Sequence, residues 1–304
     1  MVRSGALLIV PYRTLLLSCQ YVWSSRLFNT KMPMRKLNLI ALLISTFLIA
    51  DKSPAAPPVP PYQATGYSLA FFEDFTNLNL SPDSQTGDYP WYRGLWYEIV
   101  PTPYNATLQQ TGLDLAWTPG QTLPRTIIST CSQNGLHCRA FRYGYFEARM
   151  KWDVVEGAWP TFWLLPVQRI WGAQEFGELD VFEGQGETSF HESQTYYGTI
   201  HDWQVVNGIA VDSANNRTSN HVVIPGVDFS QLHTYGVLWV PGSVTWYLDD
   251  APVMSYQTYP IFDEQNFYLM LGSQVGVKWQ VGNTTGVTAP SLNLNVRWVR
   301  VWQK

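Results

Sequence analysis

The sequence has few charged residues: only 14% of its 304 residues are Asp, Glu, Lys or Arg, and the formal net charge is −4. A globular domain typically carries about 25% charged residues. Lys and Arg are scarce and unclustered, so the chain lacks the positive surface that binds phosphate backbones. These shortages exclude a disordered polyelectrolyte and argue against nucleic acid as a partner.

Long hydrophobic runs are missing after residue 50. A membrane-spanning helix needs about 20 apolar residues and the mean hydropathy is −0.11, so no stable membrane association is expected. Aromatic residues, by contrast, are abundant, with 14 Trp and 17 Tyr. Because flat aromatic faces stack well on sugar-like surfaces, their excess indicates a long groove for an uncharged ligand.

The first 55 residues are interpreted as an extension that contains a signal peptide. Met34-Arg35-Lys36 forms a short basic segment, and residues 37–50 form an apolar stretch of signal-peptide length. This pattern predicts secretion to the periplasm or the medium. A signal peptide does not normally begin thirty positions into a protein, so translation is expected to start at Met32 or Met34.

Two other interpretations of the N-terminal segment stay open. In one, translation starts at Met1, residues 7–17 form the apolar stretch, and Cys19 ends a poor lipoprotein box, although Pro11 interrupts the run. In the other, residues 37–50 remain as an uncleaved anchor of marginal length. Downstream, a proline-rich linker is expected over residues 56–64, because prolines favour extended chain that builds no core. One catalytic domain is then expected over residues 65–304.

The chain has only three cysteines. Without Cys19, the remaining Cys131 and Cys138 flank Asn134-Gly135, which is a strong signal for a tight turn. The two thiols could therefore face each other across a hairpin, and export favours a disulfide between them. The alternative is two reduced thiols, and no metal site is expected from so few ligands.

Short β-rich runs recur between Gly, Pro, Asn and Asp clusters, and helical periodicity is almost absent. This pattern predicts an all-β sandwich or barrel. The clearest strands are expected at residues 143–152, 177–183, 235–240, 244–249 and 292–302. The third and fourth would pair through the turn Pro241-Gly242.

Strand 143–152 has two distinct faces. Alternation assigns its apolar face to the core: Phe146, Ala148 and Met150. The opposite face carries an aromatic residue, an acid and a base: Tyr145, Glu147 and Arg149. This second face suits either the floor of a polar groove or a salt bridge on a solvated surface.

Strand 177–183 carries three carboxylates, Glu178, Asp180 and Glu183. On a regular strand Glu183 would point away from Glu178 and into the core, where an unpaired carboxylate is costly. One extra residue bulged out between Asp180 and Glu183 would bring all three acids to one face. Converging acids raise at least one pKa, as hydrolysis of a glycosidic bond by two carboxylates requires. The alternatives are an exposed acidic strand or a calcium site.

Residues 178–183 resemble the E-x-D-x-x-E signature of glycoside hydrolase family 16, in the bulged form of its laminarinase-like branches. The likeness extends in order from about residue 69 to the end of the chain, through residues 143–151, 159–166, 198–201, 233–237, 246–249 and 299–302. It implies a β-jelly roll of two curved antiparallel sheets with a substrate cleft across the concave one.

The resemblance implies Glu178 as the nucleophile, Glu183 as the acid/base and Asp180 as an assisting carboxylate. It also implies substrate-binding residues in the cleft: Glu147, Arg149, Trp159, Trp163 and His201. The alternatives are that the two tryptophans fill the core and that the histidine is structural. Trp171 and Trp203 are further candidates for sugar stacking because they lie nearby in the sequence.

Two departures from the family pattern matter. Gln174-Glu175-Phe176 stands where many laminarinase-like members have Trp-Pro, which leaves the subsites beside the cleavage point open. Arg297-Trp298 stands where calcium-binding members often supply an Asp. A cation is repelled by Arg297, so no calcium is expected at that position.

These observations predict a secreted, monomeric endo-β-glycosidase whose polysaccharide substrate is β-1,3- or mixed β-1,3/1,4-glucan. The retaining double displacement requires no cofactor. Three alternatives stay open. The chain could be a depolymerase or transglycosylase for another β-linked polymer, such as a galactan or a bacterial exopolysaccharide. It could be a non-catalytic β-glucan-binding protein, although such proteins typically lack the two glutamates. It could also be a surface-anchored structural protein.

Overall fold

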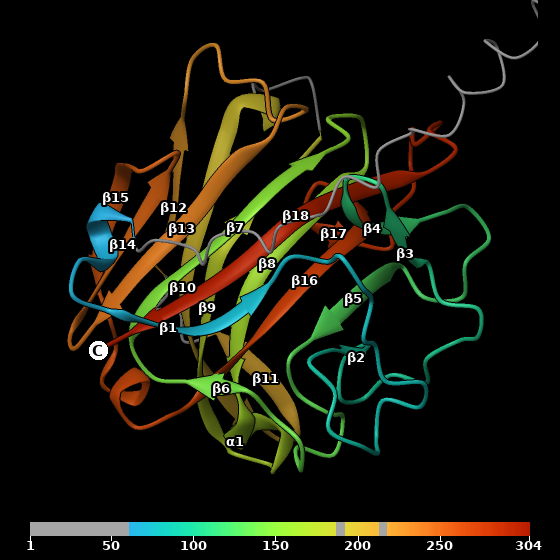
Figure 1. The fold of residues 1–304 in the computed structure, drawn as a ribbon. Helices are drawn as coiled ribbons and strands as arrows, with labels where there is room; N and C mark the ends of the chain where they lie inside the picture. The colour runs from blue at the N-terminus through green and yellow to red at the C-terminus, as the bar shows by residue number, and fades with distance from the viewer. Residues whose placement is uncertain (1–60, 187–191, 213–217) are drawn as a thin grey trace, which may run out of the picture. The chain divides into compact units, whose positions relative to one another are not determined.

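A computed structural model describes residues 61–186, 192–212 and 218–304 and shows an almost entirely β structure (Figure 1). The expected signal peptide and Cys19 lie outside these residues. Within the described part of the chain, no helix is long and apolar enough to cross a membrane. The helices are short: η1 (Tyr62–Ala64), α1 (Val167–Ile170), η2 (Glu192–Gln194) and η3 (Pro260–Asp263).

One sheet has eight strands and all its pairings are antiparallel. Its order is β15 (Ala251–Gln257), β14 (Ser243–Leu248), β13 (His233–Val240), β7 (Gly144–Trp152), β18 (Leu292–Gln303), β4 (Gly112–Trp117) and β3 (Ala106–Gln109). β1 (Ser68–Glu73) also pairs with β18.

The other sheet has ten strands and is likewise antiparallel. Its order is β11 (Ile209–Asp212), β10 (Thr195–Val206), β9 (Glu175–Glu183), β8 (Ala158–Pro166), β16 (Phe267–Val277), β5 (Arg125–Ser129) and β2 (Tyr92–Arg93). β12 (Thr218–Val223) pairs with β10, while β17 (Gln280–Val281) and β6 (Ala140–Phe141) pair with β16.

The core lies between the two sheets. Phe146 and Met150 of β7 are fully buried in the same apolar cluster as Leu179 and Phe182 of β9. The predictions of an all-β sandwich and of its clearest strands are confirmed, with ends displaced by no more than two residues. The turn at Pro241-Gly242 is also confirmed, because Val240 pairs with Ser243.

The polar face of β7 is covered. Trp302 Nε1 donates a hydrogen bond to Glu147 Oε1 at 2.9 Å, and Glu147 is 2% exposed. Ala64 of η1 is fully buried in a cluster with Tyr145 and Trp302. The packed part of the chain therefore begins before residue 65, within the segment expected to be a linker.

The prediction that Glu147 and Arg149 line the substrate cleft is wrong. β7 pairs with β13 and β18 in the eight-stranded sheet, whereas the carboxylate strand β9 belongs to the ten-stranded sheet. Arg149 instead forms a salt bridge with Asp249 at 3.1 Å. Alternation separates the two faces of a strand but does not say in which sheet the strand lies.

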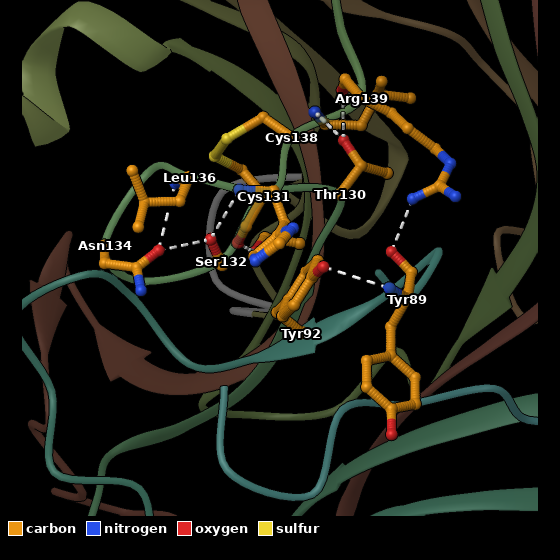
Figure 2. The surroundings of a disulfide bond; sticks show 12 residues. Tyr89, Tyr92, Thr130, Cys131, Ser132, Asn134, Leu136, Cys138 and Arg139 are labelled. Atoms are coloured by element: carbon orange, nitrogen blue, oxygen red, sulfur yellow. Dashed lines mark hydrogen bonds between the residues drawn. A yellow bond between two sulfur atoms is a disulfide. The ribbon is translucent and has the colours of Figure 1, made fainter. Parts of the chain in front are cut away.

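The hairpin of residues 131–138 is closed by a disulfide between Cys131 and Cys138 (Figure 2), which confirms that pairing. Asn134 Oδ1 accepts hydrogen bonds from Ser132 Oγ at 2.7 Å and from the Leu136 amide at 3.0 Å. Gly135 has φ +72°, a conformation that favours glycine. The predicted turn at Asn134-Gly135 is confirmed as well.

Candidate active site

A β-bulge in β9 brings the three carboxylates of this strand to one face. On the β8 side, Phe182 pairs with Phe162 and Asp180 pairs with the next residue, Trp163, so Val181 is the extra residue. Leu179, Val181 and Phe182 point into the core and are fully buried. The predicted bulge between Asp180 and Glu183 is confirmed.

Two core side chains hold the bulge in place. Trp246 Nε1, from the opposite sheet, donates to the Asp180 carbonyl at 2.8 Å. The Tyr196 hydroxyl donates to the Val181 carbonyl at 2.6 Å. A Cβ at Gly198 would clash with the Trp246 indole nitrogen, so a glycine lets this indole reach the bulge. Carbonyls displaced from the strand ladder thus keep partners, as buried polar groups must.

Each glutamate of the bulged strand accepts a hydrogen bond from a tryptophan. Trp203 Nε1 donates to Glu178 Oε2 at 2.7 Å, and Trp159 Nε1 donates to Glu183 Oε1 at 2.9 Å. These bonds orient the two carboxylates from different neighbouring strands, β10 and β8. Asp180, between them along the chain, is 2% exposed.

His201 lies between two aspartates. Its Nε2 is 3.2 Å from Asp180 Oδ2, and its Nδ1 is 2.9 Å from Asp212 Oδ2. The imidazole also stacks on Trp203, with 5.1 Å between ring centroids. Burial alone would lower the pKa of His201, but the two carboxylates outweigh it and raise this pKa to about 11. The ring is therefore a cation at neutral pH.

The electrostatics of the site favour protonated glutamates. Burial, followed by the charge of Asp180, raises the pKa of Glu178 and of Glu183 above the ordinary value for glutamate. The indole hydrogen bonds and the His201 cation oppose this rise. A proton can thus be held on one glutamate while the other is ionised, which is what acid-assisted nucleophilic attack requires.

Glu178 and Glu183 line a cavity of about 790 Å³. The lining combines acids with aromatic rings and a histidine pair: Arg125, Trp159, Glu178, Glu183, Tyr197, Thr199, His201, Trp203, His221, Trp279 and Val281. A second cavity of about 470 Å³ shares Arg125, Glu178 and Trp203 with the first and continues past Trp163 to Trp96 and Tyr97. We call the two cavities together the groove.

Most of the sequence-derived candidates meet in this groove. Trp159, Trp163, His201 and Trp203 line it. Trp171 does not line either cavity; it follows α1, is 62% exposed and lies against Gly135 of the hairpin. The two cavities thus give no support to its predicted role in sugar stacking, which was based only on proximity along the chain.

The sequence model of the family described as Glycosyl hydrolases family 16 matches residues 98–291. The chain belongs to glycosyl hydrolase family 16. It is 35% identical over 134 residues to Endo-1,3-1,4-beta-glycanase ExsH of Rhizobium meliloti (strain 1021), which covers 44% of this chain and 25% of that relative. The chain thus matches about a quarter of the relative's length.

Solved structures of other proteins share the fold of this family 16 chain. The catalytic domain of an endo-1,3-beta-glucanase (laminarinase) from Thermotoga petrophila RKU-1 aligns with a TM-score of 0.58 at 20% identity, covering 78% of this chain and 98% of that one. A GlcNAcα1-4Gal-releasing endo-β-galactosidase from Clostridium perfringens aligns with a TM-score of 0.59 at 18% identity, covering 81% and 65%. The expected jelly-roll fold is confirmed.

Several groove residues of this family 16 chain escaped the sequence analysis. Tyr197 and Thr199 lie on the same face of β10 as His201, so alternation along that strand would have found them. Trp96, Tyr97 and Trp279 come from turns, for which no periodicity exists. Their place in the groove depends on contacts between segments distant in the sequence.

Ligand atoms of Glu178, Asp180 and His201 lie within 4.8 Å of one another, as in a metal site. Nδ1 of His201 is already hydrogen-bonded to Asp212, however, and its Nε2 faces Asp180 Oδ2 at 3.2 Å. Trp203 also occupies Glu178 Oε2. A metal would have to displace these contacts, so we describe the cluster as a network of hydrogen bonds and ion pairs.

Proposed function

We propose that this chain is a retaining endo-β-glycosidase that hydrolyses β-1,3- or mixed β-1,3/1,4-glucan outside the cell. The observation that carries the proposal is the bulged strand, which presents Glu178 and Glu183 to a groove lined with indole and phenol rings and holds Asp180 on the same face. The names of the Rhizobium relative, an endo-1,3-1,4-beta-glycanase, and of the Thermotoga protein, an endo-1,3-beta-glucanase, support the choice of glucan.

In the proposed reaction, ionised Glu178 attacks the anomeric carbon while protonated Glu183 donates its proton to the glycosidic oxygen. The C–O bond breaks, the leaving sugar departs with that proton, and a covalent glycosyl-enzyme forms. Glu183, now ionised, removes a proton from a water that attacks the same carbon, and the bond from this carbon to Glu178 breaks. The product keeps its configuration, and both glutamates return to their starting states.

Asp180 and His201 are proposed to tune the nucleophile. Asp180 raises the pKa of Glu178 through its charge, while the His201 cation opposes this effect. Trp203, stacked on His201, fixes the orientation of the Glu178 carboxylate. His201 and Trp203 thus favour ionisation of Glu178, whereas burial and Asp180 oppose it.

Product analysis tests the proposed function. The purified protein is incubated with laminarin, lichenan, agarose, galactan and a succinoglycan-type polymer, and products are identified by mass and by reducing ends. Proton NMR of the first products reports their anomeric configuration. Short β-configured oligomers from laminarin or lichenan support the proposal, whereas inverted products contradict the double displacement. Binding without cleavage would indicate a glucan-binding protein.

A second candidate is cleavage of another β-linked polymer. This candidate is favoured by Phe176, which lies in the segment where many laminarinase-like members have Trp-Pro. Its ring stacks on Trp203 with 6.3 Å between centroids. The likeness to an endo-β-galactosidase fold is compatible with it. In the same assay, cleavage of galactan or of the succinoglycan-type polymer would keep the mechanism and change the substrate.

A further inference from the structure

We propose that Trp96 and Tyr97 form a sugar-binding subsite in the second cavity of the groove, which we call the glycone cavity. We also propose that the disulfide-closed hairpin positions this subsite through Gln133. The inference rests on the proposed function, because it assigns a further part of the same substrate groove. Trp96 and Tyr97 would determine specificity at a distance from the reacting carboxylates. Gln133 would position them without touching the substrate.

Trp96 and Tyr97 are the two central residues of a tight turn. The Glu98 amide donates to the Leu95 carbonyl at 3.0 Å, which closes the turn around them. Their rings meet edge to face with 4.9 Å between centroids, and both line the glycone cavity. Tyr97 is 60% exposed, so a ring with a polar tip is available to a bound sugar.

One side chain of the hairpin holds both ends of this turn. Gln133 Nε2 donates to the Leu95 carbonyl at 2.6 Å and to the Glu98 carbonyl at 3.0 Å. Gln133 Oε1 accepts a hydrogen bond from Gln85 Nε2 at 2.7 Å, which fixes the orientation of the amide. A single side-chain amide thus bridges the carbonyls of Leu95 and Glu98 at the two ends of the turn.

A buried ion pair joins the turn to the wall of the groove. Glu98 Oε2 accepts a hydrogen bond from the Leu95 amide at 2.9 Å, and Glu98 Oε1 lies 2.9 Å from Arg125 Nε. Arg125 lines both cavities. On the other side, the Arg169 guanidinium lies over Trp96 at 5.6 Å and over Phe176 at 4.8 Å. The Trp96 indole is thus held in position in the absence of a sugar.

The hairpin supplies a fixed base for Gln133. The disulfide closes the hairpin around it, and the Gln133 amide donates to the Ser84 carbonyl at 2.9 Å. Figure 2 shows the bonds from Asn134 that order the tip. Residues 131–138 line neither cavity, so Gln133 acts on the groove through the turn. The two cysteines also pack in one apolar cluster with Leu95 and Phe176.

The position of the subsite fixes which part of the substrate it holds. The glycone cavity contains Glu178 but not Glu183. Because the proposed nucleophile attacks the sugar on the glycone side of the broken bond, Trp96 and Tyr97 would hold units toward the non-reducing end. Loss of this subsite should weaken binding and move the cleavage point toward the non-reducing end.

The test uses the full chain and a β-1,3-linked glucohexaose labelled at its reducing end. The variants are Trp96→Ala/Tyr97→Ala, which removes the rings, and Gln133→Glu, which keeps the size of the side chain but cannot donate to the turn carbonyls. Both should raise KM about tenfold while kcat changes less than about twofold, and both should lengthen the labelled fragment. Trp171→Ala and Leu136→Ala, exposed residues of the same region outside the groove, should match the wild type.

An unchanged KM and fragment pattern in Trp96→Ala/Tyr97→Ala would overturn the subsite. A shift in that variant but not in folded Gln133→Glu would overturn the role of the hairpin. Should Gln133→Glu unfold, reduction of the wild-type disulfide with dithiothreitol replaces it and must reproduce the change in pattern. Should the wild type leave the hexaose intact, the proposed function fails instead. Calorimetric binding of the hexaose by the same variants then decides on the subsite.

Discussion

Two strands in opposite sheets carry glutamates that bond to indoles: β7 carries Glu147, which is buried, and β9 carries Glu178 and Glu183, which are half-buried. Each glutamate accepts a hydrogen bond of 2.7–2.9 Å from an indole, those of Trp302, Trp203 and Trp159 respectively. Burial is also the largest cause of a raised pKa in all three. By these local criteria the two strands are equivalent.

The strands differ in what lies above them. The glutamate of β7 bonds to Trp302, which packs with Ala64 of η1, and lies 3.7 Å from the Arg300 guanidinium. Those of β9 line a cavity of about 790 Å³, whose lining also includes His201 and Arg125. A buried glutamate with a raised pKa therefore marks an active site only where a cavity gives a ligand access to it.

The sharpest test of this comparison replaces each glutamate by glutamine. Glu178→Gln and Glu183→Gln should reduce hydrolysis of laminarin by about 10³-fold or more with the fold retained, because the attacking or proton-donating group is lost. Glu147→Gln should keep the activity and lower the free energy of unfolding by about 1–2 kcal/mol, because Arg300 loses its partner. Rate assays and thermal melts measure both effects. Wild-type activity in either β9 variant would contradict the proposed roles.

The histidines of the two sheets offer the next test. His201→Gln should lower kcat by about 10- to 100-fold. Because the His201 cation lowers the pKa of Glu178 and of Glu183, its loss raises both pKa values. The whole bell-shaped pH profile should then move to higher pH. His233→Gln, which removes the partner of Asp249 in the eight-stranded sheet, should leave the profile in place; a shift there would contradict the comparison.

Removing single indole hydrogen bonds should move one limb of the profile at a time. Trp203→Phe removes a hydrogen bond that lowers the pKa of Glu178. The nucleophile then ionises only at higher pH, and the acidic limb moves to higher pH. Trp159→Phe likewise raises the pKa of Glu183. The acid then stays protonated up to a higher pH, and the alkaline limb moves to higher pH. Shifts of about 0.5–1 pH unit are expected. The matched control, Trp302→Phe, should move neither limb.

The smallest expected effect concerns a turn on each sheet. Lys278 and Trp279 join β16 to β17 with φ +54° and +59°, and Asp249 and Asp250 join β14 to β15 with φ +46° and +68°. Aspartate tolerates this conformation better than tryptophan. Trp279 nevertheless occupies it and lies 4.7 Å from the ring of Tyr197 and 5.2 Å from that of Trp159.

At position 279 and at position 250, the glycine variant should therefore have a free energy of unfolding about 1 kcal/mol higher than the alanine variant, since both positions have positive φ. Only the Trp279 variants should lose activity, about tenfold, because only that turn lines the groove. Chemical denaturation and laminarin hydrolysis measure the two effects. Equal activity of Trp279→Ala and wild type would remove this turn from the groove.

The carboxylate strand β9 could be predicted because the residues that determine its shape lie in a single segment. Three acids within six residues, separated by apolar ones, require a bulge if no carboxylate is to be buried unpaired. The same argument holds for the hairpin, where Asn134-Gly135 lies between two cysteines. Both features depend on alternation and on turn chemistry, which are local properties.

The groove could not be predicted in the same way. β7 shows the same alternation whether it lies in one sheet or the other, and this ambiguity placed Glu147 and Arg149 in the wrong layer. Trp246 reaches the bulge across the core, and Gln133 reaches the turn of Trp96 and Tyr97 from a hairpin 35 or more residues away. No local pattern encodes such contacts.

The sequence by itself determined the β architecture, the bulge and the identity of the three carboxylates, because alternation and the cost of burying charge act over a few residues. Only the tertiary structure decided which strand faces the groove, which indoles bond the glutamates and which face the N-terminal segment covers. The physical reason is that access to a ligand and the field around a carboxyl depend on every element packed nearby, not on the strand that carries the group.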